Sequence, residues 1–435
     1  MIYILFIGIL ILFFLSFFLF KKNILNPSVV LCSVFLVSLF FSILNIKNWE
    51  INFYLNTILI ILGTIIIFII GNSIVYLLPK KSKIIYKGID NSVYIKLVSF
   101  KVMFFINLIS IVLLYKHFKE IYKLSILGGN PGGYNMMLYY ARNAMLNFYY
   151  VENALVKYSF YFFKAISYIN FFIFSYFIIF GKYKLKNMIL LIFPIIIYCI
   201  SIILNTGRVD FIYLLIYMLI VFFILYQQKY NFSPKITKKI IFYGILSLMA
   251  FFIIFSLVGL FTGKTQSRSV FEMISIYTGS SLPAFNIYMN SPKIPNKYFG
   301  ENTLFLVYNI LRKFGYNIPN LYVPCEFISF KVMTTNIYSA IRRYYQDFGI
   351  EGLFLITFLL GIFYGIFFYC ASYKKNNFFI LILYATFCFP IFEFPIEERF
   401  FMSLFPQGFI YNFISLGIVY YFLVYRNIKK EKLKL

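Results

Sequence analysis

Long blocks of hydrophobic residues, separated by short polar stretches, run through almost the whole chain. About 20 consecutive apolar residues let a helix cross the hydrocarbon core of a bilayer, whereas a soluble helix carries only an apolar stripe. The blocks therefore predict an all-α, polytopic integral membrane protein with about eleven transmembrane helices. The predicted spans are 2–20, 29–46, 53–78, 97–115, 158–180, 188–204, 211–226, 240–261, 353–371, 378–394 and 403–425.

Two polar segments, 116–157 and 262–352, are too long to be simple connections, because loops beyond about 15 residues usually carry structure or function. We expect a single membrane domain, 1–435, from which these two loops emerge. In the first, a glycine-rich turn at 128–133 precedes apolar residues at helical spacing: Met137, Tyr140, Ala144 and Phe148. In the second, two such groups predict amphipathic surface helices: Leu304, Val307, Leu311 and Phe314, then Ile337, Ile341, Tyr344 and Phe348.

The charged residues predict the orientation of the spans. The net charge is +26, and Lys and Arg gather in alternate loops, at 21–22, 80–96, 182–186, 229–239, 374–375 and 426–435. Loops rich in Lys and Arg stay in the cytoplasm, so we expect an external N-terminus, a cytoplasmic C-terminus and both long loops outside. Topology thus explains the positive charge, and no nucleic-acid partner is expected.

Composition also narrows the chemistry. Four of the five cysteines fall within hydrophobic blocks, and His117 is the single histidine. This set supplies neither a disulfide framework nor a zinc site, so we expect no metal or other cofactor. The first block has no basic residue before it and Lys21 and Lys22 after it, which predicts a retained anchor rather than a cleaved leader.

Acidic residues gather on the side opposite to the lysines, which indicates chemistry on the outer face. The segment 334–352 is the richest in polar groups and directly precedes a span. It carries the candidate site residues Asn336, Tyr338, Arg342, Arg343, Tyr345 and Asp347.

The arginines have two interpretations each. Arg208 lies in a tight hairpin, 205–210. It can be an interfacial anchor beside Asp210, or it can bind a phosphate, because a guanidinium can bind two oxygens at once. Arg268 can form an ordinary surface pair with Glu272 or share a cavity with it. The arginines of 334–352 can contact lipid headgroups or project into a site.

Further polar groups are ambiguous in the same way. Asp347 can cap the N–H groups of the following helix or accept a proton. The segment 393–401 can form an ion pair at the membrane edge, and the turn at 128–133 can be a simple bend or cradle a phosphate. Lys164, two turns inside its span, is expected to snorkel to the surface.

Three features together resemble the oligosaccharide repeat unit polymerases, the O-antigen polymerase (Wzy) family. They are the TGR hairpin at 206–208, the large late outer loop, and the pattern N-x-Y-S-A-x-x-x-x-Y-x-D-F-G-x-x-G at 336–352. YTGSSLPAF at 277–285 fits less specifically, and Arg268 and Gly279 match an R-x10-G spacing of some members. The first loop departs from that spacing, because Asn153 stands where Arg142 would require glycine.

The resemblance implies a glycosyltransferase-C-like enzyme in a bacterial inner membrane that serves lipopolysaccharide or capsule synthesis. It would transfer a glycan from undecaprenyl pyrophosphate to a sugar hydroxyl of the next lipid-linked unit, on the outer face. A flippase and a chain-length regulator would be its partners.

The residues can be assigned roles in such a reaction, which needs no metal if arginines stabilise the pyrophosphate. Arg208, Arg268 and Arg342 or Arg343 would contact the pyrophosphate. Asp347 would take the acceptor proton, with Glu326 or Glu397 as the alternatives. The expected substrate contacts are Asn336, Tyr338, Tyr345, Arg142, Glu326 and Glu397.

Two other functions remain open. An O-antigen ligase uses a similar fold and donor, but members usually carry a histidine in the large outer loop, and none lies in 262–352. A flippase or transporter of lipid-linked sugars would place its charges along a central path, whereas these charges are predicted at the outer boundary.

Overall fold

A computed structural model describes residues 1–77, 93–134, 136–147, 153–181, 188–207, 209–232, 242, 244, 246, 269–291, 296–318, 326–374, 376–404 and 408–430 of the protein. The chain divides into two compact units. The first unit comprises Met1–Ile84, Ser269–Ser372 and Phe387–Ile410. The second comprises Ile85–Arg268, Tyr373–Thr386 and Tyr411–Leu435.

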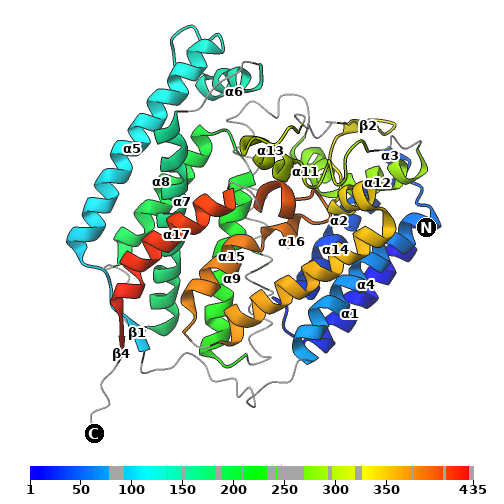
Figure 1. The fold of residues 1–435 in the computed structure, drawn as a ribbon, viewed down its shortest axis with the longest axis horizontal. Coiled ribbons are helices and arrows are strands. Elements are labelled where there is room, and N and C mark those ends of the chain that lie inside the picture. Colours follow the sequence, from blue (N-terminus) through cyan, green and yellow to red (C-terminus); the bar gives the residue numbers. More distant parts are fainter. Residues whose placement is uncertain are drawn as a thin grey trace. The chain divides into compact units, whose positions relative to one another are not determined.

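The first unit is built mainly from helices (Figure 1). They are α1 (Ile2–Leu19), α2 (Pro27–Leu44), α3 (Ile46–Trp49), α4 (Leu55–Leu77), α11 (Val270–Gly279), α12 (Ser281–Asn290), α13 (Phe305–Lys313), most of α14 (Ala340–Tyr373), α16 (Phe389–Glu393) and the π-helix η2 (Phe400–Leu404). A small antiparallel pair, β2 (Ile328–Ser329) and β3 (Thr334–Thr335), precedes α14.

The second unit is also mainly helical. It contains α5 (Phe100–Leu127), α6 (Met137–Asn147), α7 (Ala154–Phe180), α8 (Ile189–Leu204), α9 (Val209–Lys229), most of α15 (Phe378–Phe387), most of α17 (Gly408–Leu423) and the 3-10 helix η3 (Tyr425–Asn427). Strands β1 (Val93–Ile95) and β4 (Ile428–Lys430) pair antiparallel, with Val93 opposite Lys430.

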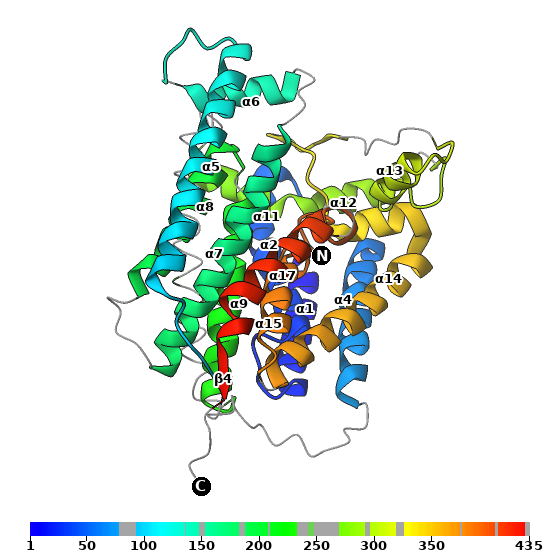
Figure 2. The same cartoon turned by 60° about the vertical axis from the view of Figure 1, so that its left-hand side comes forward.

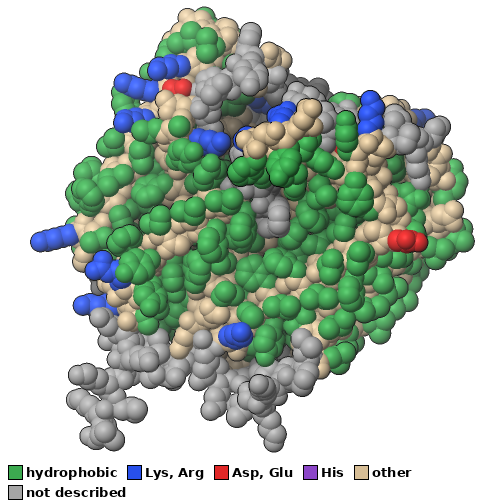
Figure 3. All heavy atoms as spheres, in the orientation of Figure 1, with side chains coloured by type: hydrophobic (Ala, Val, Ile, Leu, Met, Phe, Trp, Pro, Cys, Tyr) green, Lys and Arg blue, Asp and Glu red, His purple; other side chains and the backbone are tan. Residues whose placement is uncertain are grey.

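The helices confirm a mostly helical, multi-pass membrane protein. Among the described residues, 8 helices are long and apolar enough to cross a membrane, and Ile189–Leu204 and Phe378–Glu393 are shorter apolar helices. All of them match predicted spans. The predicted span 240–261 lies outside the described residues, apart from Phe242, Gly244 and Leu246. Hydrophobic side chains cover most of the face drawn in Figure 3, as expected for helices that meet lipid.

Helices α4 and α14 lie side by side and touch through their backbones (Figures 1 and 2). A Cβ on Gly71 would lie 2.3 Å from the carbonyl oxygen of Phe358, and one on Gly361 would lie 2.4 Å from that of Phe68. Gly361 and Gly365 form a G-x-x-x-G pattern, which lets membrane helices approach closely. These glycines therefore fix α14 against α4.

The predicted continuous span 378–394 is interrupted. Helix α15 ends at Phe387 and α16 begins at Phe389, because Pro390 has no N–H to continue the ladder. The hydroxyl of Tyr364 donates to the freed carbonyl of Phe387 at 3.2 Å. In lipid an unsatisfied carbonyl is costly, so this bond permits the break.

In the second unit, α5 continues about three turns beyond the predicted end of its span. The glycine-rich turn follows, and α6 packs back against α5 through Ala141 and Ala144. The predicted helix after 128–133 is therefore confirmed.

Candidate functional site

Gly349 divides α14 into a short arm, residues 340–348, and a long helix, residues 350–373. Its φ of 66° and ψ of −166° lie in a region that is essentially restricted to glycine. Gly352 is also required, because a Cβ there would lie 2.1 Å from the Cβ of Phe348. The prediction that a separate short helix turns into a span within 334–352 is therefore confirmed.

Hydrogen bonds fix the start of the arm. The backbone N–H of Ala340 donates to the carbonyl of Phe394 at 3.0 Å, and the hydroxyls of Thr335 and Ser280 are 3.0 Å apart. The arm is thus tied to the segment after α16, and β3, which precedes the arm, is tied to Ser280 between α11 and α12.

Arg342 is the most buried charged residue of the arm. It has no exposed surface, and its guanidinium carbon lies 3.6 Å from the ring centroid of Tyr338 and 4.5 Å from that of Tyr288. Its Nη2 forms an ion pair with Glu326, whereas Nε and Nη1 have no hydrogen-bond partner within the described residues. A lipid-headgroup contact does not fit so buried a side chain, but an enclosed cation with spare donors suits an anionic ligand.

Asp347 binds a segment distant in sequence. Its Oδ1 accepts from the side-chain amides of Asn296 at 2.7 Å and Asn302 at 2.9 Å, and its Oδ2 accepts from the backbone N–H of Thr303 at 2.5 Å. Asn302 in turn accepts from Nη1 of Arg343 at 3.3 Å. The carboxylate thus holds the segment before α13 against the arm and does not cap the helix that follows it.

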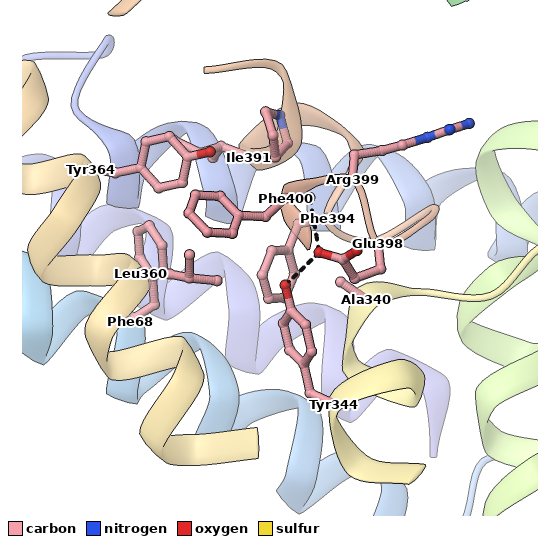
Figure 4. Close-up of a pocket in the computed structure, with 11 residues that line it drawn as sticks. Phe68, Ala340, Tyr344, Leu360, Tyr364, Ile391, Phe394, Glu398, Arg399 and Phe400 are labelled. Carbon is pink, nitrogen blue, oxygen red and sulfur yellow. Dashed lines mark hydrogen bonds between the residues drawn. The ribbon is translucent and has the colours of Figure 1, made fainter. Parts of the chain in front are cut away.

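Glu398 anchors the π-helix η2. Its carboxylate is fully buried and accepts from the hydroxyl of Tyr344 at 2.8 Å and from the backbone N–H groups of Phe400, Phe401 and Met402 at 2.8 to 2.9 Å (Figure 4). Burial raises the pKa of this carboxyl, although its hydrogen bonds favour the charged form. Such a cap stabilises η2 and joins it to the arm.

Arg399 forms the ion pair expected for 393–401. Its guanidinium lies 3.1 Å from Glu393 and 2.6 Å from Glu397, and it points away from the small pocket that Tyr344 and Glu398 help to line (Figure 4). Glu397 keeps 41% of its side chain exposed, whereas Glu393 is buried. Glu397 is therefore the more accessible of the two carboxylates.

The other predicted substrate contacts have mixed environments. Asn336 is exposed, Tyr338 is buried under the Arg342 guanidinium, and Tyr345 is half-buried and edge-on to Phe285 at 6.3 Å. The arm thus brings Arg342, Tyr338 and Glu326 together. Tyr288 also contacts Arg342, and this was not predicted. Apart from its being aromatic, nothing in the sequence marks Tyr288 as a site residue.

The remaining predicted arginines are Arg208, Arg268 and Arg142. Arg208 and Arg268 lie outside the described residues. Arg142 is half-buried on α6, beyond the glycine-rich turn. In that turn Asn130 accepts from the backbone N–H of Gly132 at 3.2 Å and donates to the carbonyl of Gly133 at 2.8 Å. The turn is bonded to itself, which favours the simple bend over a phosphate cradle.

The hairpin before α9 is held by a buried histidine. His117 Nε2 lies 2.7 Å from Oδ1 of Asn205, and Thr206 has a left-handed φ of 54°. On α7, Lys164 is only 8% exposed, so the expectation that it snorkels to the surface is wrong. Among the described residues, no group of three or more His, Cys, Asp or Glu could hold a metal ion.

Comparison with known proteins gives one informative similarity. No family model matches the chain, and no solved structure matches it significantly. An O-antigen polymerase of Shigella dysenteriae is 28% identical over 196 residues, which cover 44% of this chain and 48% of that protein. The match thus spans about half the length of that relative. This similarity supports the resemblance to the O-antigen polymerase family that the TGR hairpin and residues 336–352 indicated.

Proposed function

We propose that this protein polymerises lipid-linked oligosaccharide repeat units at the outer face of a bacterial inner membrane. The similarity to an O-antigen polymerase carries this proposal, since it supports a polymerase role in O-antigen synthesis. The growing glycan would be attached to undecaprenyl pyrophosphate. The protein would have its N-terminus outside and its C-terminus in the cytoplasm. A flippase and a chain-length regulator would be its partners.

In the proposed reaction a hydroxyl of the incoming unit attacks the anomeric carbon of the growing glycan. The bond from that carbon to the pyrophosphate breaks, and the hydroxyl proton passes to a carboxylate. Negative charge develops on the leaving pyrophosphate, so fixed guanidinium groups would lower the barrier. Arg208 and Arg268 retain this role as predictions.

On the arm, Arg342 and Arg343 are the proposed cations. Arg342 has two nitrogens without hydrogen-bond partners among the described residues, and Arg343 is half-buried beside Asn302. For the base we prefer Glu397 to Asp347. Glu397 is 41% exposed, whereas both oxygens of Asp347 already accept hydrogen bonds from the segment before α13.

The direct test is incubation of the purified protein with lipid-linked repeat units. A polymerase gives a ladder of products that differ by one unit, together with free undecaprenyl pyrophosphate. A ligase would transfer glycan only to an added lipid A–core acceptor, and a transporter would release no pyrophosphate. Absence of a ladder from protein that is folded and supplied with its matching unit would reject the proposal.

A further inference from the structure

Lys164 is a charged residue enclosed within the second unit. It lies on α7, ten residues from the start of a helix long enough to span a membrane, and is 8% exposed. Its ammonium is 5.5 Å from the ring centroid of Tyr168 and 5.9 Å from that of Tyr213. A charge held inside a membrane protein is costly and usually marks a functional position.

The aromatic rings satisfy this ammonium incompletely. A lysine carries three N–H donors, yet within the described part of the chain Lys164 has ring contacts and neither a hydrogen-bond nor an ion-pair partner. Both ring distances are close to the limit of about 6 Å at which cation–π attraction matters. An anionic oxygen would supply what the rings cannot.

The surroundings of Lys164 are rigid. Tyr168 stacks on Tyr217 with ring centroids 4.0 Å apart, and the hydroxyl of Tyr217 donates to the carbonyl of Tyr168 at 2.7 Å. Asp210, in the first turn of α9, interacts electrostatically with Lys164. The ammonium is thus enclosed by aromatic rings and lies within electrostatic reach of Asp210, at the start of α9.

We propose that Lys164 binds a phosphate oxygen of a polyprenyl pyrophosphate. The inference rests on the proposed function for the lipid, and on the buried, incompletely satisfied ammonium for the anion. Tyr168 and Tyr213 would flank the phosphate, and the repulsion from Asp210 would limit how tightly it is held.

The experiment measures binding by the purified full-length protein in detergent micelles, using farnesyl pyrophosphate, farnesol and inorganic pyrophosphate as probes. We expect Lys164→Met to weaken farnesyl pyrophosphate binding about 10-fold or more, because a charge-assisted hydrogen bond is lost. Lys164→Arg should keep most of the affinity. Lys101→Met is the matched control, since Lys101 also lies in a long hydrophobic helix but is exposed.

The three probes identify the source of the anion. Binding of farnesyl pyrophosphate alone supports a lipid site, and equal binding of inorganic pyrophosphate supports a site for the headgroup. Farnesol binding as tightly as farnesyl pyrophosphate would overturn the proposal, as would wild-type affinity in Lys164→Met. If Lys164→Met does not fold, Lys164→Gln carries the same expectation. A protein that binds but does not polymerise would reject only the proposed function.

Discussion

Arg342 of the first unit and Lys164 of the second are both cations with almost no exposed surface, but their partners differ. Arg342 lies between two tyrosines and forms an ion pair with Glu326. Lys164 contacts two tyrosine rings, and the described residues give it no ion pair. A buried cation in a close ion pair stabilises the fold, even where spare donors remain for a ligand, as in Arg342. A buried cation such as Lys164, which interacts electrostatically with Asp210 but forms no ion pair within the described residues, costs the fold more free energy. The two residues should therefore respond differently to substitution.

The largest expected effect concerns the carboxylates of the first unit. Glu397→Gln should lower the polymerisation rate about 100-fold, which is typical of losing a general base, while protein level and melting temperature stay unchanged. Asp347→Asn should instead lower the melting temperature, because it weakens the bonds to Asn296 and Thr303. Single-turnover ladder assays measure the loss of activity, and thermal unfolding measures the loss of stability. A normal polymerisation rate in Glu397→Gln would show that Glu397 is not the base.

Removal of the paired cation should cost stability. Arg342→Met is expected to lower the free energy of unfolding by about 2 kcal/mol, through lost contacts with Tyr288 and Tyr338. The pair with Glu326 adds little to this figure, because that carboxylate is 38% exposed and screened by water. Reversible unfolding in mixed micelles measures the change, with the exposed Arg312→Met as control. Unchanged stability would contradict the structural half of the comparison.

The arm should be sensitive at its break. Gly349→Ala is expected to cost about 1–2 kcal/mol, because alanine is strained at a φ of 66° and ψ of −166° although no atom lies within 4 Å of the added carbon. Gly244→Ala, also with open space around it and no such φ, is the steric control. Equal melting temperatures for both variants would show that the glycine-specific conformation at Gly349 does not affect stability.

The smallest expected effect is the one that tests the comparison most directly. Lys164→Met should change the free energy of unfolding by less than about 1 kcal/mol, because removing the cost of a buried charge offsets the lost ring contacts and the lost attraction to Asp210. The same unfolding assay as for Arg342→Met applies. A loss as large as that of Arg342→Met would make Lys164 a structural residue.

The sequence predicted the elements better than their contacts. Spans follow from hydrophobic length, and α6, α13 and the arm follow from helical periodicity, which is a local property. The interruption at Pro390 was missed because it depends on a carbonyl partner, Tyr364, from another helix. Residues 393–401 did yield the expected ion pair, because its members are close in sequence.

The environment of single site residues could not be derived from local patterns. Asp347 meets Asn296 and Asn302 across more than 40 positions, so only the folded chain reveals it as an anchor. Lys164 was expected to snorkel because the sequence shows only how deep it lies in its span. The sequence does not show that Tyr168 and Tyr213 cover the helix face that carries it. Recognition of 336–352 identified a segment, and the geometry then separated the roles within it.

The contact between α4 and α14 has a thermal consequence. At Gly71 and Gly361 each helix contacts the backbone of the other, so little apolar side-chain surface is buried there. The attraction at these positions therefore comes from dispersion and weak Cα–H···O bonds. Such forces lack the large heat-capacity change that makes hydrophobic association fade on cooling. This helix pair should therefore hold with nearly constant strength from cold to warm growth conditions.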